Sequence, residues 1–229
     1  MIRIIPTPYM AVEGEGKFAL DGTSVYVHAN DIRISRAVQV LCSEIGKKCG
    51  GFIPFSAGKP QGHYIYVRAG NDALCESYTL EVTPECIMIE SGGPAGAYWG
   101  IQSLRQLVSD GDVPVCRIYD RPDFRFRGFY QDITRGRVNK LSHLCSIVDM
   151  LSYYKINMLQ LYVEDAFMFR EFCGIITEDE ALTPAEMLEL DEYCFDHFID
   201  LGKLLLPNLV VFIRKMGNKE IDLRSIHIN

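Results

Sequence analysis

The sequence has no long hydrophobic run and no basic stripe. Its apolar stretches stay below the roughly 20 residues needed to span a bilayer, and Met1–Pro6 lacks the longer apolar stretch of a secretory signal. The net charge of -7 argues against a nucleic-acid partner, because such proteins need a basic face to displace counterions. We therefore expect a cytoplasmic protein with no membrane or nucleic-acid partner, unless a leader was removed upstream.

Paired cysteine motifs are also missing. None of the 8 Cys residues forms a CxxC, and their spacings match no zinc-site pattern. Most occupy apolar stripes of expected helices or strands, where a free Cys behaves as a small hydrophobe. The histidines His63, His143 and His197 have no Cys or carboxylate partner at metal-ligand spacing. We expect unpaired structural thiols, no metal and no cofactor.

The first half of the chain is typical of an α+β domain. With 48% hydrophobic residues the chain can bury a core. Thr23–His28 alternates like a strand, while Tyr78–Val82 and Cys86–Ile89 are expected to pair as a hairpin. Asp31–Ile45 and Pro94–Val108 each have one apolar stripe at helical spacing. Because each helix has one stripe, we expect a mainly antiparallel sheet with both helices on the same face.

The second half alternates strands and helices. Strands are expected over Phe124–Ile133 and Met158–Val163, with a helix over Lys140–Tyr154 between them. Thr183–Glu186 is a capping box with Pro at the first helical position, which predicts the start of a helix. Leu204–Phe212, interrupted by a proline, is a third strand candidate. Three β/α units in series indicate a barrel or a doubly wound sheet.

The two halves are separated by a segment that contains Gly111, Pro114 and Pro122. We therefore expect two domains, an α+β domain over residues 1–115 and an α/β domain over residues 121–229.

Three motifs suggest chemistry but are better explained by structure. Gly14–Gly16 looks like a dinucleotide fingerprint, yet a strand rather than a helix is expected to follow it. Gly92–Pro94 precedes a helix without the Lys or Ser/Thr of a phosphate loop, so it is expected to allow close packing of helix and sheet. Asp191 and Glu192 lie in a helix beside its apolar stripe, where a solvated face belongs.

Polar residues follow two of the expected parallel strands. Arg135 lies just past the first strand, and Glu164 and Asp165 end the second. Active sites of β/α barrels form at this carboxyl-terminal rim. A guanidinium and one or two carboxylates there could hold the hydroxyls of a sugar through charge-assisted hydrogen bonds. The alternative is a salt bridge between Arg135 and Asp165, and the sequence does not decide between the two.

An ordered series of motifs resembles glycoside hydrolase family 20, the β-N-acetylhexosaminidases. Glu76–Val82, Ile87–Ser91 and Gly96–Leu107 resemble the α/β domain that precedes the catalytic barrel in this family. Ile118–Arg135 resembles the first barrel strand, and Lys155–Asp165 resembles the second. The resemblance runs from about Ile4 to about Leu201. It implies that the second domain consists of the first β/α units of an incomplete TIM barrel.

The resemblance implies that Arg135 contacts the sugar and that Asp165, next to Glu164, does so as well. Its partner would be a glycan with a terminal N-acetylhexosamine. The sequence departs from the family at Gln160 and Tyr162, where many members carry His. It departs again after the third strand candidate, where members usually continue with Gly-His, and Gly202–Leu205 looks inserted.

Family members cleave with help from the substrate's own acetamido group, which an Asp orients while a Glu protonates the leaving oxygen. That pair belongs after the fourth barrel strand, and these 229 residues end before it. We therefore expect no catalytic residues in this chain, no activity of its own, and self-association through the open barrel edge. Two alternatives stay open: a related barrel glycosidase of the α-glucuronidase or O-GlcNAc hydrolase type, or a non-catalytic protein that binds carbohydrate or associates with partners.

Overall fold

The computed structural model describes residues 2–58, 60–135, 139–163, 167, 181–205 and 209–212, with the backbone alone from residue 203 onward. The chain divides into two compact units. The first unit is Met1–Arg125 together with Ser152–Lys155, and the second is Phe126–Leu151 with Ile156–Asn229. The domain ranges 1–115 and 121–229 stay a prediction.

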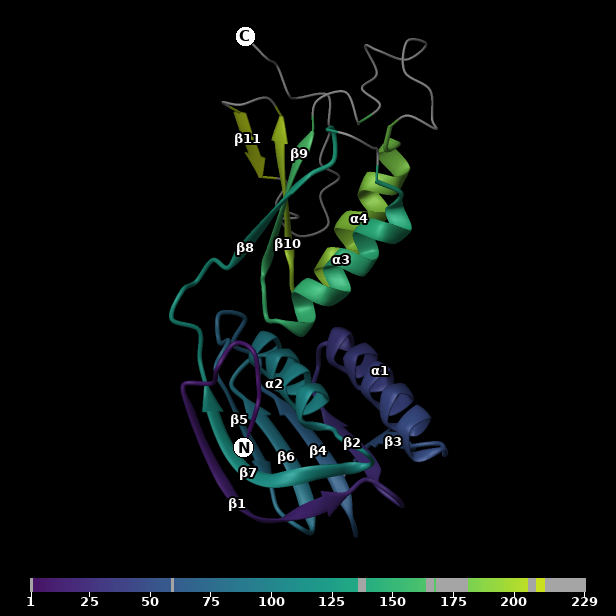
Figure 1. Cartoon of the computed structure of the whole chain (residues 1–229), viewed down its shortest axis with the longest axis vertical. Helices are drawn as coiled ribbons and strands as arrows, with labels where there is room; N and C mark the ends of the chain where they lie inside the picture. Colours follow the sequence, from purple (N-terminus) through teal and green to yellow (C-terminus); the bar gives the residue numbers. More distant parts are fainter. Residues whose placement is uncertain are drawn as a thin grey trace. The chain divides into compact units, whose positions relative to one another are not determined.

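The first unit is a seven-stranded sheet with two helices (Figure 1). Its elements are β1 (Met10–Ala19), β2 (Ser24–His28), α1 (Ile32–Cys49), β3 (Phe55–Ala57), β4 (Tyr64–Ala69), β5 (Tyr78–Val82), β6 (Cys86–Ser91), α2 (Pro94–Leu107) and β7 (Asp112–Asp120). The strand order is β1-β7-β5-β6-β4-β2-β3. The expected hairpin is confirmed, since β5 pairs antiparallel with β6.

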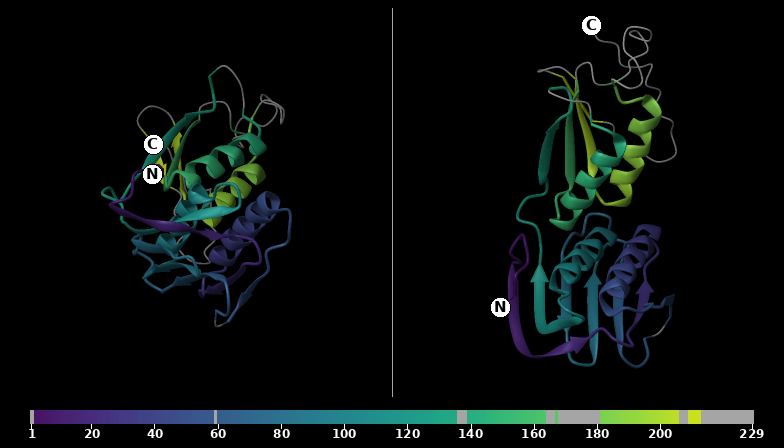
Figure 2. Two further views of the ribbon diagram at one scale, coloured as in Figure 1. Left: turned by 60° about the horizontal axis from the view of Figure 1, so that its bottom comes forward. Right: turned by 45° about the vertical axis from the view of Figure 1, so that its right-hand side comes forward.

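Both helices cover the same face of this sheet, as predicted (Figures 1 and 2). The residues that face them are buried and alternate along each strand, such as Ile65 and Val67 on β4. The predicted α+β class is thus confirmed, but only part of the sheet is antiparallel. β1, β7, β5 and β6 are joined by antiparallel pairings, and β6, β4, β2 and β3 by parallel ones. The parallel part arises because α1 carries the chain back over the sheet before β3 and β4 begin.

Helix α1 shows how local sequence sets its ends. The Asp31 side chain accepts a hydrogen bond from the backbone N–H of Arg33 at 2.9 Å and caps the amino terminus. Gly50 ends the helix with φ of 70°, a left-handed conformation that costs glycine little. Lys47 and Lys48 lie in the last turn, where cations interact favourably with the helix dipole.

The second unit is a four-stranded sheet with two helices packed on one face (Figure 2). Its elements are β8 (Gly128–Asp132), α3 (Leu141–Tyr153), β9 (Met158–Val163), α4 (Pro184–Asp196), β10 (Asp200–Leu205) and β11 (Leu209–Phe212). The strand order is β11-β10-β9-β8, and β8, β9 and β10 are parallel. The succession of parallel strands and helices agrees with the first β/α units of a barrel.

The prediction for the third strand is wrong in position. Leu204–Phe212 was expected as one strand, but it contains the end of β10 and then β11, which returns antiparallel to β10. The third parallel strand starts earlier, at Asp200, and includes Gly202–Leu205. Whether these residues are inserted relative to the family stays a prediction. The apolar run after Leu204 dominated the sequence pattern, whereas the register is set by pairing with β9.

The core of the second unit lies between its sheet and its helices. Leu159 and Leu161 of β9 are fully buried against residues of both helices, including Leu144 and Leu190. Thr183 forms the predicted capping box with Glu186 at the start of α4. Among the residues that the structure describes, no helix is long and apolar enough to cross a membrane.

Candidate functional site

A tight turn follows β8 and holds the first predicted site residue. The Asp132 Oδ1 atom accepts hydrogen bonds from the backbone N–H groups of Thr134 at 2.9 Å and Arg135 at 3.2 Å. These two bonds fold the chain back directly after the strand. The bond from Thr134, with that from Arg135 and its nearby charge, lowers the pKa of Asp132, so this carboxylate is ionised at neutral pH.

The same turn is attached to the end of β9. The backbone N–H of Ile133 donates to the carbonyl oxygen of Tyr162 at 3.3 Å. Two strands that are sequential parallel neighbours therefore meet at one rim, with the Asp132 turn above the first and Tyr162 near the end of the second. This is the carboxyl-terminal rim on which β/α barrels build their sites.

Arg135 is exposed at this rim and interacts with two groups. Its Nη1 atom lies 3.3 Å from Asp132 Oδ2, and its Cζ lies 5.0 Å from the ring centroid of Tyr162. A cation over a tyrosine ring is attracted by the negative face of the ring. Arg135 is thus held in place by a carboxylate on one side and an aromatic ring on the other.

The predicted partners of Arg135 cannot be placed. Glu164 and Asp165 lie outside the described residues, so both the sugar-binding role of Arg135, Glu164 and Asp165 and the alternative Arg135–Asp165 salt bridge stay predictions. The described ion pair of Arg135 is with Asp132.

Sequence reasoning missed the roles of Asp132 and Tyr162. An Asp at the end of a strand, followed two residues later by a Thr, is a local signal for a turn in which the carboxylate accepts backbone N–H groups. The ring of Tyr162 could not be assigned to Arg135 from sequence, because the contact depends on the pairing of β8 with β9.

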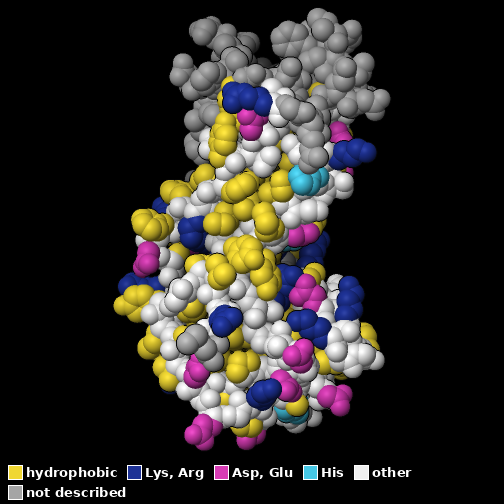
Figure 3. Space-filling view, in the orientation of Figure 1, with side chains coloured by type: hydrophobic (Ala, Val, Ile, Leu, Met, Phe, Trp, Pro, Cys, Tyr) yellow, Lys and Arg dark blue, Asp and Glu magenta, His cyan; other side chains and the backbone are white. Residues whose placement is uncertain are grey.

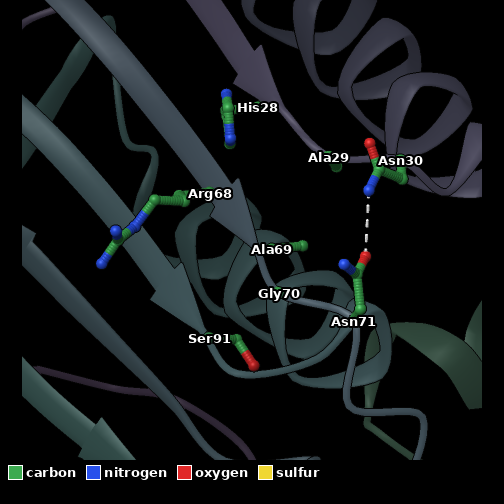
Figure 4. Close-up of a pocket in the computed structure, with 8 residues that line it drawn as sticks. All are labelled: His28, Ala29, Asn30, Arg68, Ala69, Gly70, Asn71 and Ser91. Atoms are coloured by element: carbon green, nitrogen blue, oxygen red, sulfur yellow. Dashed lines mark hydrogen bonds between the residues drawn. The ribbon is translucent and has the colours of Figure 1, made fainter.

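A pocket lies elsewhere, in the first unit. It is formed where the parallel strands β2, β4 and β6 end, and it measures about 360 Å³ (Figure 4). Its lining residues are His28, Ala29, Asn30, Arg68, Ala69, Gly70, Asn71 and Ser91. None of the sequence motifs singled out these residues as a group.

The motifs that were set aside as structural take structural positions. A side chain at Gly93 would collide with the carbonyl oxygen of Asp72, so this glycine permits close packing before α2. Asp191 and Glu192 lie within α4. His63 stacks on Phe18 with ring centroids 4.0 Å apart. The described residues contain no group of three or more His, Cys, Asp or Glu that could hold a metal.

Seven cysteines fall in the described part of the chain, and all are free thiols as predicted. Burial raises the pKa of Cys42 and of Cys116 to about 11, which keeps these thiols protonated. Cys75 differs. Burial by itself raises its pKa, but hydrogen bonds with Ser77, Ser91 and the Gly92 backbone outweigh this effect and lower it.

The fold is similar to that of two solved carbohydrate-cleaving enzymes, a β-hexosaminidase and a chitobiase. The structure resembles that of a mutant Streptomyces plicatus β-hexosaminidase in complex with the product GlcNAc, with a TM-score of 0.77, 21% identity, and coverage of 88% of this chain and 45% of that one. It also resembles the *Flavobacterium johnsoniae* chitobiase, with a TM-score of 0.73 and 22% identity over 87% of this chain and 34% of that one. At these identities the similarity shows the fold.

The sequence itself establishes the family. Residues 1–121 match the family described as glycosyl hydrolase family 20, domain 2. This match covers more than half of the chain, and the chain therefore belongs to glycosyl hydrolase family 20.

Two relatives show how much of such a protein the chain represents. It is 28% identical to the N,N'-diacetylchitobiase of *Vibrio harveyi* over 166 residues, which is 71% of this chain and 18% of the relative. It is 28% identical to the beta-N-acetylhexosaminidase of *Cellulomonas fimi* over 175 residues, 72% of this chain and 35% of the relative. The chain thus spans about a third or less of either relative.

Proposed function

We propose that this chain forms part of an exo-acting glycoside hydrolase that removes terminal N-acetylhexosamine from glycans by the substrate-assisted, retaining mechanism. Membership of family 20 supports the reaction class, and the names of the relatives support the substrate. The single observation that carries the proposal beyond family membership is Arg135, which is exposed at the carboxyl-terminal rim of β8 and oriented by Asp132 and Tyr162.

Arg135 would bind the sugar in this proposal. A guanidinium has five N–H donors in a fixed planar arrangement, a geometry that suits hydrogen bonds to sugar hydroxyls. The turn bonds from Thr134 and Arg135 to Asp132 fix the backbone from which the guanidinium extends. This arrangement places the cation before the ligand arrives, which lowers the entropy cost of binding.

We further propose that the 229 residues alone do not hydrolyse N-acetylhexosaminides. Loss of one catalytic acid or base typically costs about 10²–10⁴-fold in rate, and the resemblance to the family implies that its Asp-Glu pair has no counterpart among these residues. The chain would bind the sugar product weakly without cleaving a glycoside.

Two measurements on the purified chain test the proposal. A chromogenic N-acetylglucosaminide should give no turnover. A rate of about 10 per second would show that the catalytic residues lie within this chain. In ligand-observed NMR, N-acetylglucosamine should bind, and Arg135→Met should remove that binding. Arg117→Met is the matched control, because Arg117 is also exposed but lies on β7 of the first unit. Equal binding by all three proteins would contradict the role of Arg135.

A further inference from the structure

The pocket in the first unit has the dimensions of a small-molecule site. Three neighbouring parallel strands, β6, β4 and β2, end at the same edge of the sheet, and the segments that follow them surround the pocket (Figure 4). Its volume of about 360 Å³ falls in the range of about 300–1,000 Å³ that is usual for ligand pockets. Parallel sheets of α/β proteins commonly bind ligands beyond the carboxyl ends of their strands.

Five of the eight lining residues are polar and none is acidic. His28 and Arg68 lie directly opposite each other on β2 and β4, and they are the two ionisable lining residues. Asn30 follows β2 and Asn71 follows β4, and the Asn30 Nδ2 donates to Asn71 Oδ1 at 3.1 Å across the pocket (Figure 4). Each amide keeps further donors and acceptors after this bond.

The third strand contributes Ser91, whose hydroxyl is fixed in orientation. Ser91 Oγ donates to the carbonyl oxygen of Ser77 at 2.7 Å and accepts from the backbone N–H of Gly93 at 3.1 Å. Cys75 Sγ lies 3.9 Å from the same oxygen, so this hydroxyl is held within the wall of the pocket.

The acidic side chains around the pocket are already engaged. Glu90 Oε1 lies 2.8 Å from Arg68 Nε, with side-chain exposures of 38% and 56%. An ion pair this exposed is weak, and the terminal N–H groups of the guanidinium can still donate to another anion. Asp31 pairs with Arg33 at 2.7 Å, and Asp72 Oδ1 accepts from the Leu74 N–H at 2.9 Å.

We infer that this pocket binds a small hydroxylated molecule carrying one oxyanion, of the class of sugar acids or sugar phosphates. Arg68 and His28 would bind the oxyanion by charge-assisted hydrogen bonds, and the Asn30 and Asn71 amides would bind hydroxyls. No Phe, Tyr or Trp lines the pocket, so the inferred recognition rests on these polar groups. The site is separate from Arg135, and the inference does not depend on the proposed hydrolase function.

The test measures binding directly by ligand-observed NMR and titration calorimetry on the full chain. D-Glucuronate and D-glucose are the first pair of probes, because they differ by the carboxylate. D-Glucose 6-phosphate distinguishes a phosphate ligand from a carboxylate ligand. We expect one of the two anionic probes to bind and glucose not to bind.

Three variants locate the binding. Arg68→Met should weaken it by about tenfold or more, since it removes a charge-assisted contact. Glu90→Gln should strengthen it, because the competing carboxylate is lost. Arg117→Met removes another exposed arginine, on β7, and should leave the binding unchanged. The inference would be overturned if binding survived Arg68→Met, or if it fell equally in Arg117→Met. It would also be overturned if glucose bound as strongly as the anions, or if neither anion bound.

Discussion

Lys155 Nζ lies 2.8 Å from Asp120 Oδ2, and both side chains are almost completely buried, at 6% and 11% exposure. The same Lys155 amine donates to the Tyr78 hydroxyl at 2.8 Å, and that hydroxyl donates to Asp120 Oδ2 at 2.9 Å. The other carboxylate oxygen, Oδ1, accepts from the backbone N–H groups of Tyr9 and Arg121. Asp120 is thus a fully hydrogen-bonded buried carboxylate, and the Ser152–Lys155 segment is held within the first unit through it.

Replacing Lys155 with Met should lower the free energy of unfolding by about 3–5 kcal/mol, because Asp120 would then be a buried charge without its cation. Urea denaturation followed by circular dichroism measures the loss. Lys17→Met is the control, since the Lys17–Asp112 pair is exposed and its removal should cost at most about 1 kcal/mol. Equal effects of the two substitutions would show that the buried pair has no special role.

Burial, and then the adjacent charge of Asp120, raises the pKa of Tyr78. The phenol therefore stays protonated and able to donate up to high pH. Tyr78→Phe removes this donor from the carboxylate while keeping the ring, and should destabilise the protein by about 1–3 kcal/mol in the same denaturation experiment. Tyr119→Phe on β7 is a comparison that leaves the network intact. An unchanged stability in Tyr78→Phe would contradict the proposed donation.

Local signals in the sequence predicted elements well where a few adjacent residues determine the structure. Thr183 and Glu186 specify the start of α4 within a single turn, and the apolar run Met158–Val163 has the bounds of β9. The neighbours of each strand, and contacts between side chains of different strands, were harder to predict from the sequence. The parallel partners of β4, the position of β10 and the contact of Arg135 with Tyr162 depend on residues distant in sequence.

The Lys155 network illustrates the same limit, since 77 positions separate Lys155 from Tyr78. A lone Lys after a helix gives no sign that it will be buried, because lysine is normally exposed. The pocket beside His28 and Arg68 was missed for a related reason. Its residues follow three different strands and become neighbours only when those strands pair in parallel.

Cys75 should react faster with alkylating reagents than Cys42 and Cys116. Its lowered pKa gives a larger thiolate fraction near pH 8 than Cys42 or Cys116, whose pKa values are raised to about 11 by burial. Native-state alkylation with iodoacetamide, followed by peptide mapping, should label Cys75 first. Its rate should level off at a lower pH than that of a free cysteine. Faster labelling of Cys42 or Cys116 would contradict this order, and Cys75→Ser identifies the fast phase.

The capping box at the start of α4 should be worth about 1 kcal/mol. Thr183 Oγ1 accepts from the Glu186 N–H at 3.2 Å, and Glu186 Oε2 accepts from the Thr183 N–H at 2.9 Å. Thr183→Ala removes the first bond and should cost about 0.5–2 kcal/mol in urea denaturation. Glu189→Ala, an exposed position in the same helix, should change stability by no more than about 0.5 kcal/mol. A loss in Glu189→Ala as large as that in Thr183→Ala would show that the effect is not specific to the cap, because alanine has a higher helix propensity than glutamate.

The edge strand β8 leads us to expect self-association of these 229 residues. In the strand order β11-β10-β9-β8, the outer side of β8 has no neighbour among the described strands. Unpaired backbone groups at such an edge favour pairing with another chain. Apolar side chains are exposed on β8 and just before it, with Tyr130 at 49%, Phe129 at 37% and Phe126 at 61% exposure. Figure 3 shows apolar side chains at the surface of this unit.

Sedimentation velocity at increasing protein concentration should therefore show dimers or larger species. Tyr130→Lys places a charge on the edge strand, which is a common protection against edge-to-edge pairing, and should shift the protein to monomers. Leu188→Lys introduces the same charge at an exposed site on α4, where Leu188 is 62% exposed, and should leave the association unchanged. If Leu188→Lys dissociates the protein equally well, the association is a general effect of net charge. If the unmodified chain is monomeric at every concentration, the edge of β8 is not an association surface.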